Sequence, residues 1–332
     1  MTVPAAAAPG APSLRYHRLL RGLPRYRWWK PLLALLVAAF LWVAFQVVVA
    51  VAVLAVAFAT GGIRLDTVAH AQDDLLSYAT LDAARPLTLI LALGSVATLL
   101  PAVVLSYLIV GLRPASVVRS VAFRIRWRWL AACLVPAVAI TAVATVVQLF
   151  VLPLALGGWP MAPTTPVGDW IVCTVVILIV TPLQAAAEEF GFRGLFSQMF
   201  GSWVRWAPVT IVVAAIPFTV LHTQYWGWAT ADVAFFALVA GFVTWRTGGL
   251  EAGIALHSVN NTLAFLLLAS GIYGTTQNQG GAGDPWSLLV TIVTMGLYAL
   301  WIDRMARRRA LKAVLDPLPQ PAAPDPASLV AE

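Results

Sequence analysis

Long apolar blocks separated by short polar connections dominate the pattern of this chain. Several blocks exceed the ~18–20 residues with which a helix crosses the core of a bilayer. The pattern is helical and differs from the every-second-residue alternation of an outer-membrane barrel. It predicts an all-α polytopic membrane protein with about eight transmembrane helices, at residues 31–58, 87–112, 129–156, 170–200, 207–222, 231–245, 250–272 and 286–302.

The composition agrees with that prediction. Hydrophobic residues make up 61% and charged residues 11% of the 332 positions, and the mean hydropathy is +0.85. Soluble domains carry roughly 25% charged residues, so a water-soluble globular protein is excluded. The first block is longer than the ~7–15 apolar residues of a signal peptide, and we expect it to be a retained helix. Cys133 and Cys173 lie inside blocks, which favours packing over a disulfide or a thiolate metal site.

The distribution of charge predicts how the helices are oriented. Of the 21 Lys and Arg residues, all but Arg64 and Arg85 fall in segments on one side of the predicted membrane. The positive-inside rule therefore places both termini in the cytoplasm, and an even number of spans agrees with this orientation. We expect a multi-pass protein of the plasma membrane. The segment 124–129, with three arginines and two tryptophans, is expected to be an interfacial anchor.

The net charge of +7 does not indicate a nucleic-acid partner, because the basic residues cluster at the ends of the apolar blocks. This placement favours membrane lipids as partners. Residues 60–85 form the longest external connection and are expected to include a short surface helix. The Ala- and Pro-rich segments 1–14 and 316–332 are expected to be disordered.

Five polar residues inside apolar blocks are the candidates for function. An ionisable group costs ~2.5–3.5 kcal/mol at the centre of a membrane helix, so its presence there usually serves a role. The five are confined to three predicted helices: Glu188, Glu189, His222, His257 and Asn261. We expect them to form one site in the cytoplasmic half of the membrane.

The spacing in the first of these helices separates the two glutamates. Glu189 and Arg193 are four residues apart, so they share a helix face and can form an ion pair. Glu188 points about 100° away from its neighbour, because a helix has 3.6 residues per turn. Glu188 is therefore the carboxylate that is free for other chemistry.

The other two helices carry a matching spacing of four. Phe218 precedes His222 by one turn and can pack beneath its imidazole, and His257 and Asn261 can face the same part of the bundle. A carboxylate, two imidazoles and a carboxamide that converge could form a hydrolytic site, with Glu188 as general base and His or Asn stabilising an oxyanion. Alternatively, Glu188, His222 and His257 could hold a divalent metal ion that activates water.

Three motifs in this region resemble those of the CPBP family, the CAAX proteases and bacteriocin-processing enzymes of the type II CAAX prenyl endopeptidase group. The stretch EEFGFR at residues 188–193 resembles the EExxxR motif of this family. Residues 218–222 resemble its FxxxH motif, and residues 257–261 resemble its HxxxN motif. Each motif alone is common, but here all three occur in order on separate predicted helices. The resemblance covers roughly residues 165–275.

The resemblance implies an intramembrane endopeptidase that acts on a membrane-associated peptide or protein. Glu188 would be the base that activates water together with His222, while His257 and Asn261 would stabilise the oxyanion. Glu189 and Arg193 would hold the geometry of the site.

Whether a metal ion takes part is left open by the resemblance. The family is commonly called a metalloprotease family, so the expected cofactor is either none or a divalent metal such as zinc. The sequence lacks the HExxH helix of zinc metalloproteases, and the carboxamide of Asn261 is a poor zinc ligand. We favour the metal-free version.

Two alternatives from other classes remain. One is a non-proteolytic membrane scaffold or bacteriocin-immunity-type protein of the same fold. The other is a proton-coupled transporter, because intramembrane Glu and His also relay protons. The predicted organisation comprises a basic N-terminal segment, helices 1–3, a protease core, helix 8 and a cytoplasmic tail, at 1–30, 31–164, 165–275, 276–303 and 304–332.

Overall fold

The computed structural model describes residues 13–158, 162–272, 274–276 and 281–316, and it confirms the all-α polytopic architecture. Within these ranges, seven helices are long and apolar enough to cross a membrane, which makes this a multi-pass membrane protein. They are Lys30–Ala59, Pro86–Val110, Trp127–Ala155, Val167–Trp203, Trp228–Thr247, Glu251–Ser270 and Pro285–Arg308.

The predicted span at 207–222 differs from the others. It forms α10 (Ala207–Leu221), a helix of 15 residues, which is shorter than the ~20 residues that cross a bilayer core. The chain leaves the helix at His222 and starts the next one at Trp228. The expectation of eight full-length spans is therefore corrected to seven long helices and one short helix.

Three of the long helices are composites in which a π-helical stretch separates α-helical parts. The first contains α3 (Pro86–Leu89), η2 (Ile90–Gly94), α4 (Ser95–Ala97) and α5 (Leu99–Val110). The second contains α6 (Trp127–Val146), η4 (Val147–Val151) and α7 (Leu152–Ala155). The third contains α8 (Val167–Glu188), η5 (Glu189–Phe196) and α9 (Ser197–Trp203). Such π turns locally re-aim side chains and often occur at functional sites.

The remaining helices are continuous: α1 (Lys30–Ala59), α11 (Trp228–Thr247), α12 (Glu251–Ser270) and α13 (Pro285–Arg308). Large apolar side chains cover the outside of the bundle, as on α1, where the Phe40 side chain is 74% exposed. Helices that are apolar all round are typical of a protein whose solvent is lipid.

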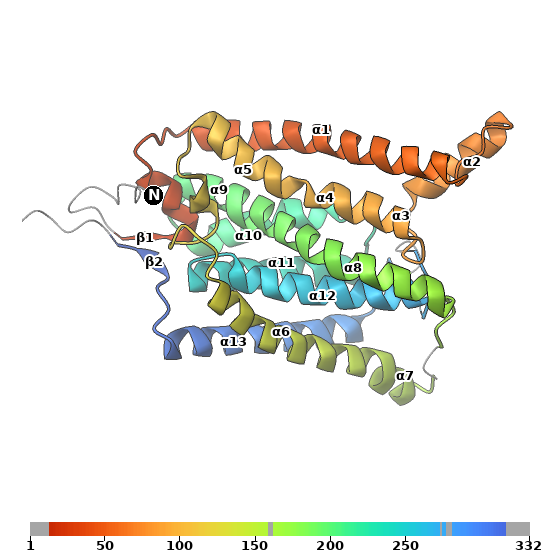
Figure 1. Ribbon diagram of the computed structural model, residues 1–332. Helices are drawn as coiled ribbons and strands as arrows, with labels where there is room; N and C mark the ends of the chain where they lie inside the picture. The colour runs from red at the N-terminus through yellow and green to blue at the C-terminus, as the bar shows by residue number, and fades with distance from the viewer. Residues whose placement is uncertain (1–12, 159–161, 273, 277–280, 317–332) are drawn as a thin grey trace, which may run out of the picture.

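Helix α12 lies inside the bundle and packs against α8, α6 and α11. Figure 1 shows α1 and α5 along one edge of the bundle and α6 and α13 along the other, with α8 and α12 between them. The two helices that carry the EExxxR-like and HxxxN-like motifs are therefore neighbours in the interior.

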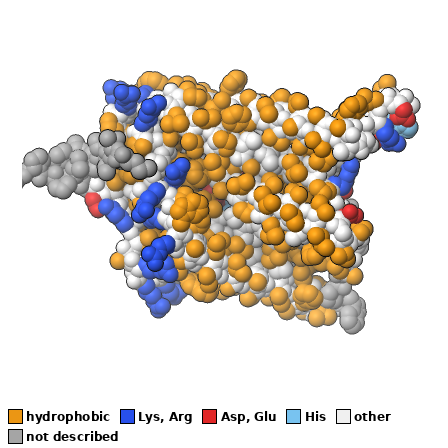
Figure 2. All heavy atoms as spheres, in the orientation of Figure 1, with side chains coloured by type: hydrophobic (Ala, Val, Ile, Leu, Met, Phe, Trp, Pro, Cys, Tyr) orange, Lys and Arg blue, Asp and Glu red, His pale blue; other side chains and the backbone are white. Residues whose placement is uncertain are grey.

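The first and last described segments meet at one end of the molecule. Strand β1 (Leu14–Arg15) pairs antiparallel with β2 (Val314–Leu315). Lys and Arg side chains gather at this end (Figure 2). The pairing puts both segments on one side, while the cytoplasmic location of that side stays a prediction. Residues 1–12 and 317–332 of the segments expected to be disordered lie outside the described residues; Leu14, at the edge of the first, is ordered in β1.

The opposite end carries the predicted surface helix of the 60–85 connection, α2 (Val68–Ala79). It extends away from the bundle (Figure 1). The Arg64 guanidinium donates to Asp74 at 3.0 Å. This contact with Arg64 lowers the pKa of the Asp74 carboxyl to about 2.

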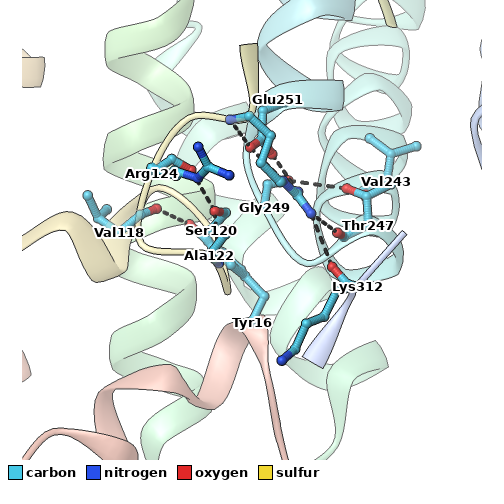
Figure 3. A network of polar contacts seen from close by, with 11 residues as sticks. Tyr16, Val118, Ser120, Ala122, Arg124, Val243, Thr247, Gly249, Glu251 and Lys312 are labelled. Atoms are coloured by element: carbon cyan, nitrogen blue, oxygen red, sulfur yellow. Dashed lines mark hydrogen bonds and ion pairs between the residues drawn. The ribbon is translucent and has the colours of Figure 1, made fainter. Parts of the chain in front are cut away.

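A buried ion pair fastens α12 to the basic end of the bundle. Glu251 is fully buried and accepts hydrogen bonds from Arg126 Nε at 2.8 Å and Nη2 at 2.6 Å. The same guanidinium donates to the Thr247 and Lys312 carbonyls, so it joins the start of α12, the end of α11 and the C-terminal segment (Figure 3). The expectation that the whole segment 124–129 is an interfacial anchor is therefore wrong for Arg126, whose partner is a carboxylate inside the protein.

Candidate active site

The junction of α8 and η5 gives Glu188 and Glu189 different surroundings. Glu188 is the last residue of α8, and Glu189 starts the π-helical stretch. Glu188 lines a cavity in the bundle, whereas Glu189 does not and is fully buried. The placement agrees with the predicted divergence of the two side chains, although their roles stay predictions.

Glu189 is held by two cationic or proton-donating groups. Its Oε1 accepts from Arg193 Nη1 at 3.0 Å and lies 2.9 Å from His257 Nδ1. Arg193 also donates to the Ala237 carbonyl, and its guanidinium carbon lies 4.1 Å from the centre of the Phe218 ring. Because a carboxylate paired with arginine carries no proton, Nδ1 of His257 is the donor. Glu189 thus fixes the orientation of the His257 ring and leaves Nε2 facing the cavity.

Only one of the two carboxylate oxygens of Glu188 accepts a hydrogen bond from a described residue. Its Oε1 accepts from Gln184 Nε2 at 2.7 Å. Its Oε2 lies 3.5 Å from His257 Nε2 and has no hydrogen-bond partner among the described residues. A buried carboxylate oxygen without a partner is costly, which is typical of a group reserved for a water molecule or a ligand.

His222 stands at the end of α10 and contributes its other ring nitrogen to the cavity. Its Nδ1 lies 2.6 Å from the Phe218 carbonyl, which can only accept, so Nδ1 carries the proton. In the neutral ring, Nε2 is then an acceptor. The Phe218 ring centre lies 4.4 Å from the His222 ring and 5.9 Å from the His257 ring, so this aromatic side chain contacts both imidazoles.

Asn261 joins the site through a residue that the sequence analysis missed. Asn261 Nδ2 donates to Gln184 Oε1 at 3.2 Å, and Gln184 Nε2 donates to Glu188. Gln184 therefore links the carboxylate of α8 to the carboxamide of α12. The spacing in the sequence could have identified Gln184, because it lies four residues before Glu188 and shares its helix face. Its side chain is not ionisable, so it does not stand out among the polar residues of an apolar block.

The cavity has a volume of about 520 Å³ and collects the predicted residues from three helices, α8, α10 and α12. Glu188, His222, His257 and Asn261 all line it. The same cavity is also lined by polar residues of α6, η4, α11 and α13, namely Thr141, Thr145, Gln148, Asp232 and Thr291. The volume falls within the range of ordinary ligand pockets, ~300–1,000 Å³.

The residues do not fit the alternative metal centre. Within the described ranges, no group of three or more His, Cys, Asp or Glu side chains is placed to hold a metal ion. Glu188, His222 and His257 therefore share the cavity without forming a ligand set.

Comparison with known families relates this site to the resemblance noted in the sequence. Residues 168–263 match the family model described as type II CAAX prenyl endopeptidase Rce1-like. This segment, less than a third of the chain, is similar to the Rce1-like family. It begins in α8, ends in α12 and contains all three motifs, so the predicted resemblance is confirmed over these residues.

A similar curated protein is the uncharacterized protein YyaK of Bacillus subtilis strain 168. It is 28% identical over 156 residues, which cover 42% of this chain and 51% of the relative. The match thus spans about half the length of that relative. No solved structure matches the chain.

Proposed function

We propose that this protein is an intramembrane endopeptidase that hydrolyses a peptide bond of a membrane-associated peptide or protein. The observation that carries the proposal is the free Oε2 of Glu188, which faces a cavity 3.5 Å from His257 Nε2. The Rce1-like segment supports a protease of the CAAX type. We further propose that the enzyme works in the plasma membrane, with the site in its cytoplasmic half.

The first step is the activation of water in the cavity. Glu188 Oε2 and His222 Nε2 are both acceptors, so together they orient a water molecule. As the water oxygen attacks the carbonyl carbon of the scissile bond, one of its protons passes to Glu188 Oε2. Gln184 holds the other oxygen of the carboxylate and limits its rotation.

The oxyanion formed by this attack requires hydrogen-bond donors. Asn261 Nδ2 has two protons, of which Gln184 accepts one, so the second can be donated to the oxyanion. His257, when protonated at Nε2, supplies another donor in the orientation that Glu189 sets. When the C–N bond breaks, the proton on Glu188 passes to the leaving nitrogen, which yields an amine and a carboxylic acid and restores the Glu188 carboxylate; the acid then releases its proton to water.

The decisive experiment compares peptides in membranes that contain the wild type or Glu188→Gln. The wild type should generate new peptide ends that mass spectrometry detects and that are absent with Glu188→Gln. Asn261→Ala should lower the rate by ~10²–10³, as expected for one oxyanion donor. Excess chelator should leave cleavage by the wild type unchanged, because the proposed steps use only protein side chains and water.

The outcomes separate the proposal from its alternatives. A scaffold or immunity-type protein would produce no new peptide ends with either form. A proton-coupled transporter would show Glu188-dependent proton uptake in liposomes without cleavage. If chelator reversibly abolishes cleavage, and if zinc is bound by the wild type but not by His257→Ala, the metal-free mechanism is wrong. The protein would still be a protease.

A further inference from the structure

A second carboxylate lines the cavity, and the proposed hydrolysis does not use it. Asp232 is in the second turn of α11 and contributes to the same cavity wall as Thr291 of α13. Its Oδ1 is buried and has no hydrogen-bond partner in the part of the chain that the structure describes. The stabilising effect of a helix dipole falls off within the first turn, so the start of α11 does not account for this charge.

The position of Asp232 relative to the reacting groups follows from helix geometry. Phe236 lies four residues later on the same face of α11, and its ring centre is 4.8 Å from that of His257. Asp232 is thus about 6 Å from the level of His257 along the helix axis, at a rise of 1.5 Å per residue.

Helix α12 follows α11 through a short connection and runs in the opposite direction, so Asn261 lies one turn beyond His257 toward the same end of the bundle. Asp232 and Asn261 therefore face the cavity at about the same level.

Within the described ranges, Asp232 has no permanent cation beside it in the cavity, whose two histidines are engaged by Phe218 and Glu189. Among the described residues that line the cavity, none is Lys or Arg. A charge inside a membrane helix that has no opposite charge beside it is costly, and the Thr291 hydroxyl, which hydrogen-bonds to Asp232, is neutral. The complementary positive charge is therefore expected to come from a molecule that enters the cavity.

We propose that Asp232 binds a positively charged nitrogen of the substrate, either the side chain of a Lys or Arg residue or a free amino terminus. An extended peptide rises by about 3.3 Å per residue, so the 6 Å offset corresponds to about two residues. The charged group then lies within about three residues of the cleaved bond. This proposal rests on the proposed endopeptidase function and makes Asp232 a specificity-determining residue.

The test uses purified protein in liposomes and apolar peptides that differ at one position. Each peptide carries Lys, Arg, norleucine or citrulline near its centre, and mass spectrometry maps the cleaved bond. A second set, with free or acetylated amino termini, distinguishes a terminal amine from a basic side chain. The wild type should cleave the charged peptides with a kcat/KM at least about tenfold higher, the low end for a hydrogen bond to a charged group.

Two variants test whether the preference for charged peptides depends on Asp232. Asp232→Asn should cleave charged and neutral peptides equally. The matched control is Asp169→Asn, which removes the same charge from an exposed position on α8 outside the cavity and should keep the preference. Cleavage without a charge preference in the wild type, or a preference that survives Asp232→Asn, would overturn this inference and leave the protease standing.

Peptide binding can be measured in a variant that does not cleave, which tests the role of Asp232 separately from catalysis. Fluorescence anisotropy with labelled Lys and norleucine peptides compares Glu188→Gln with Glu188→Gln/Asp232→Asn. A stronger affinity for the Lys peptide that disappears in the double variant supports the inference. Equal binding of both peptides by Glu188→Gln contradicts it. The absence of any Glu188-dependent cleavage would refute the proposed function alone.

Discussion

At the scale of single residues, two adjacent carboxylates differ in their partners and in their access to the cavity. Glu189 is fully buried between Arg193 and His257. Glu188 keeps Oε2 without a partner among the described side chains. Oε2 of Glu189 also has no partner among them, but only Glu188 lines the cavity. We therefore propose that Glu189 orients the imidazole and that Glu188, whose free oxygen is at the cavity, is the base.

Replacing each glutamate by glutamine should separate these roles. Glu189→Gln leaves the Arg193 guanidinium buried beside a neutral group. The free energy of unfolding should therefore fall by ~3–5 kcal/mol, the cost of breaking a buried ion pair. Glu188→Gln removes no ion pair with arginine and should keep the thermal stability of the wild type. Thermal unfolding in detergent measures both. An equal loss of stability in the two variants would remove the basis for assigning them different roles.

The contacts that the sequence does not predict are those between residues distant in the chain. A uniformly apolar helix gives no sign of which face is turned inward, so the contacts of Gln184 with Asn261 could not be predicted from α8 alone. Arg126 was interpreted as an anchor because a basic residue at the end of an apolar block is typical of an interface. Its partner Glu251 starts another helix 125 residues away.

At the scale of elements, the N-terminal 3-10 helix η1 (Tyr16–Gly22) docks on α9 at the basic end of the bundle. His17 is buried there and donates from Nε2 to the Arg205 carbonyl at 3.2 Å. Burial lowers the pKa of His17 below its ordinary value of 6.5, and the nearby Arg18 and Arg15 lower it further. The folded protein therefore favours the neutral imidazole.

The contribution of His17 should depend on pH. Because its pKa is lower in the folded state, its stabilising effect is fully present above pH 6.5 and is lost as the pH falls toward the lowered pKa. The melting temperature of the wild type should thus exceed that of His17→Gln by more at pH 7.5 than at pH 5.5. His70→Gln, on the exposed α2, is the matched control. A difference that stays constant with pH would contradict the assignment.

Elements were more predictable than their lengths. The apolar blocks predicted the seven long helices of the described residues, because so many consecutive apolar residues are typical of a membrane span. The shortness of α10 was not predictable, since its apolar block continues to His222, and only the turn that follows ends it. The π-helical stretch η5 was also missed, because the pattern of EEFGFRGLF fits an ordinary helix equally well.

At the scale of the whole molecule, the two ends of the bundle differ in charge. The basic end holds the paired strands β1 and β2, and the other end holds α2 with Asp66, Asp73 and Asp74. The positive-inside rule then predicts that β1 and β2 face the cytoplasm and α2 faces outward.

Cysteine labelling tests this orientation. Gln72→Cys, at an exposed position of α2, is introduced after the buried Cys133 and Cys173 are replaced by alanine. In intact cells the new thiol should react with a membrane-impermeant reagent, while a cysteine introduced at Arg124 should react only after lysis. The reverse result would invert the predicted topology.

The most direct test of the central claim, peptide-bond hydrolysis that depends on Glu188, is the fate of the water oxygen. Liposomes that contain the purified protein are incubated with a cleaved peptide in water enriched in oxygen-18, with excess chelator present. With the wild type, one oxygen-18 atom is expected in the new terminal carboxylate, and with Glu188→Gln no product is expected. Labelled product at an undiminished rate with Glu188→Gln would contradict it.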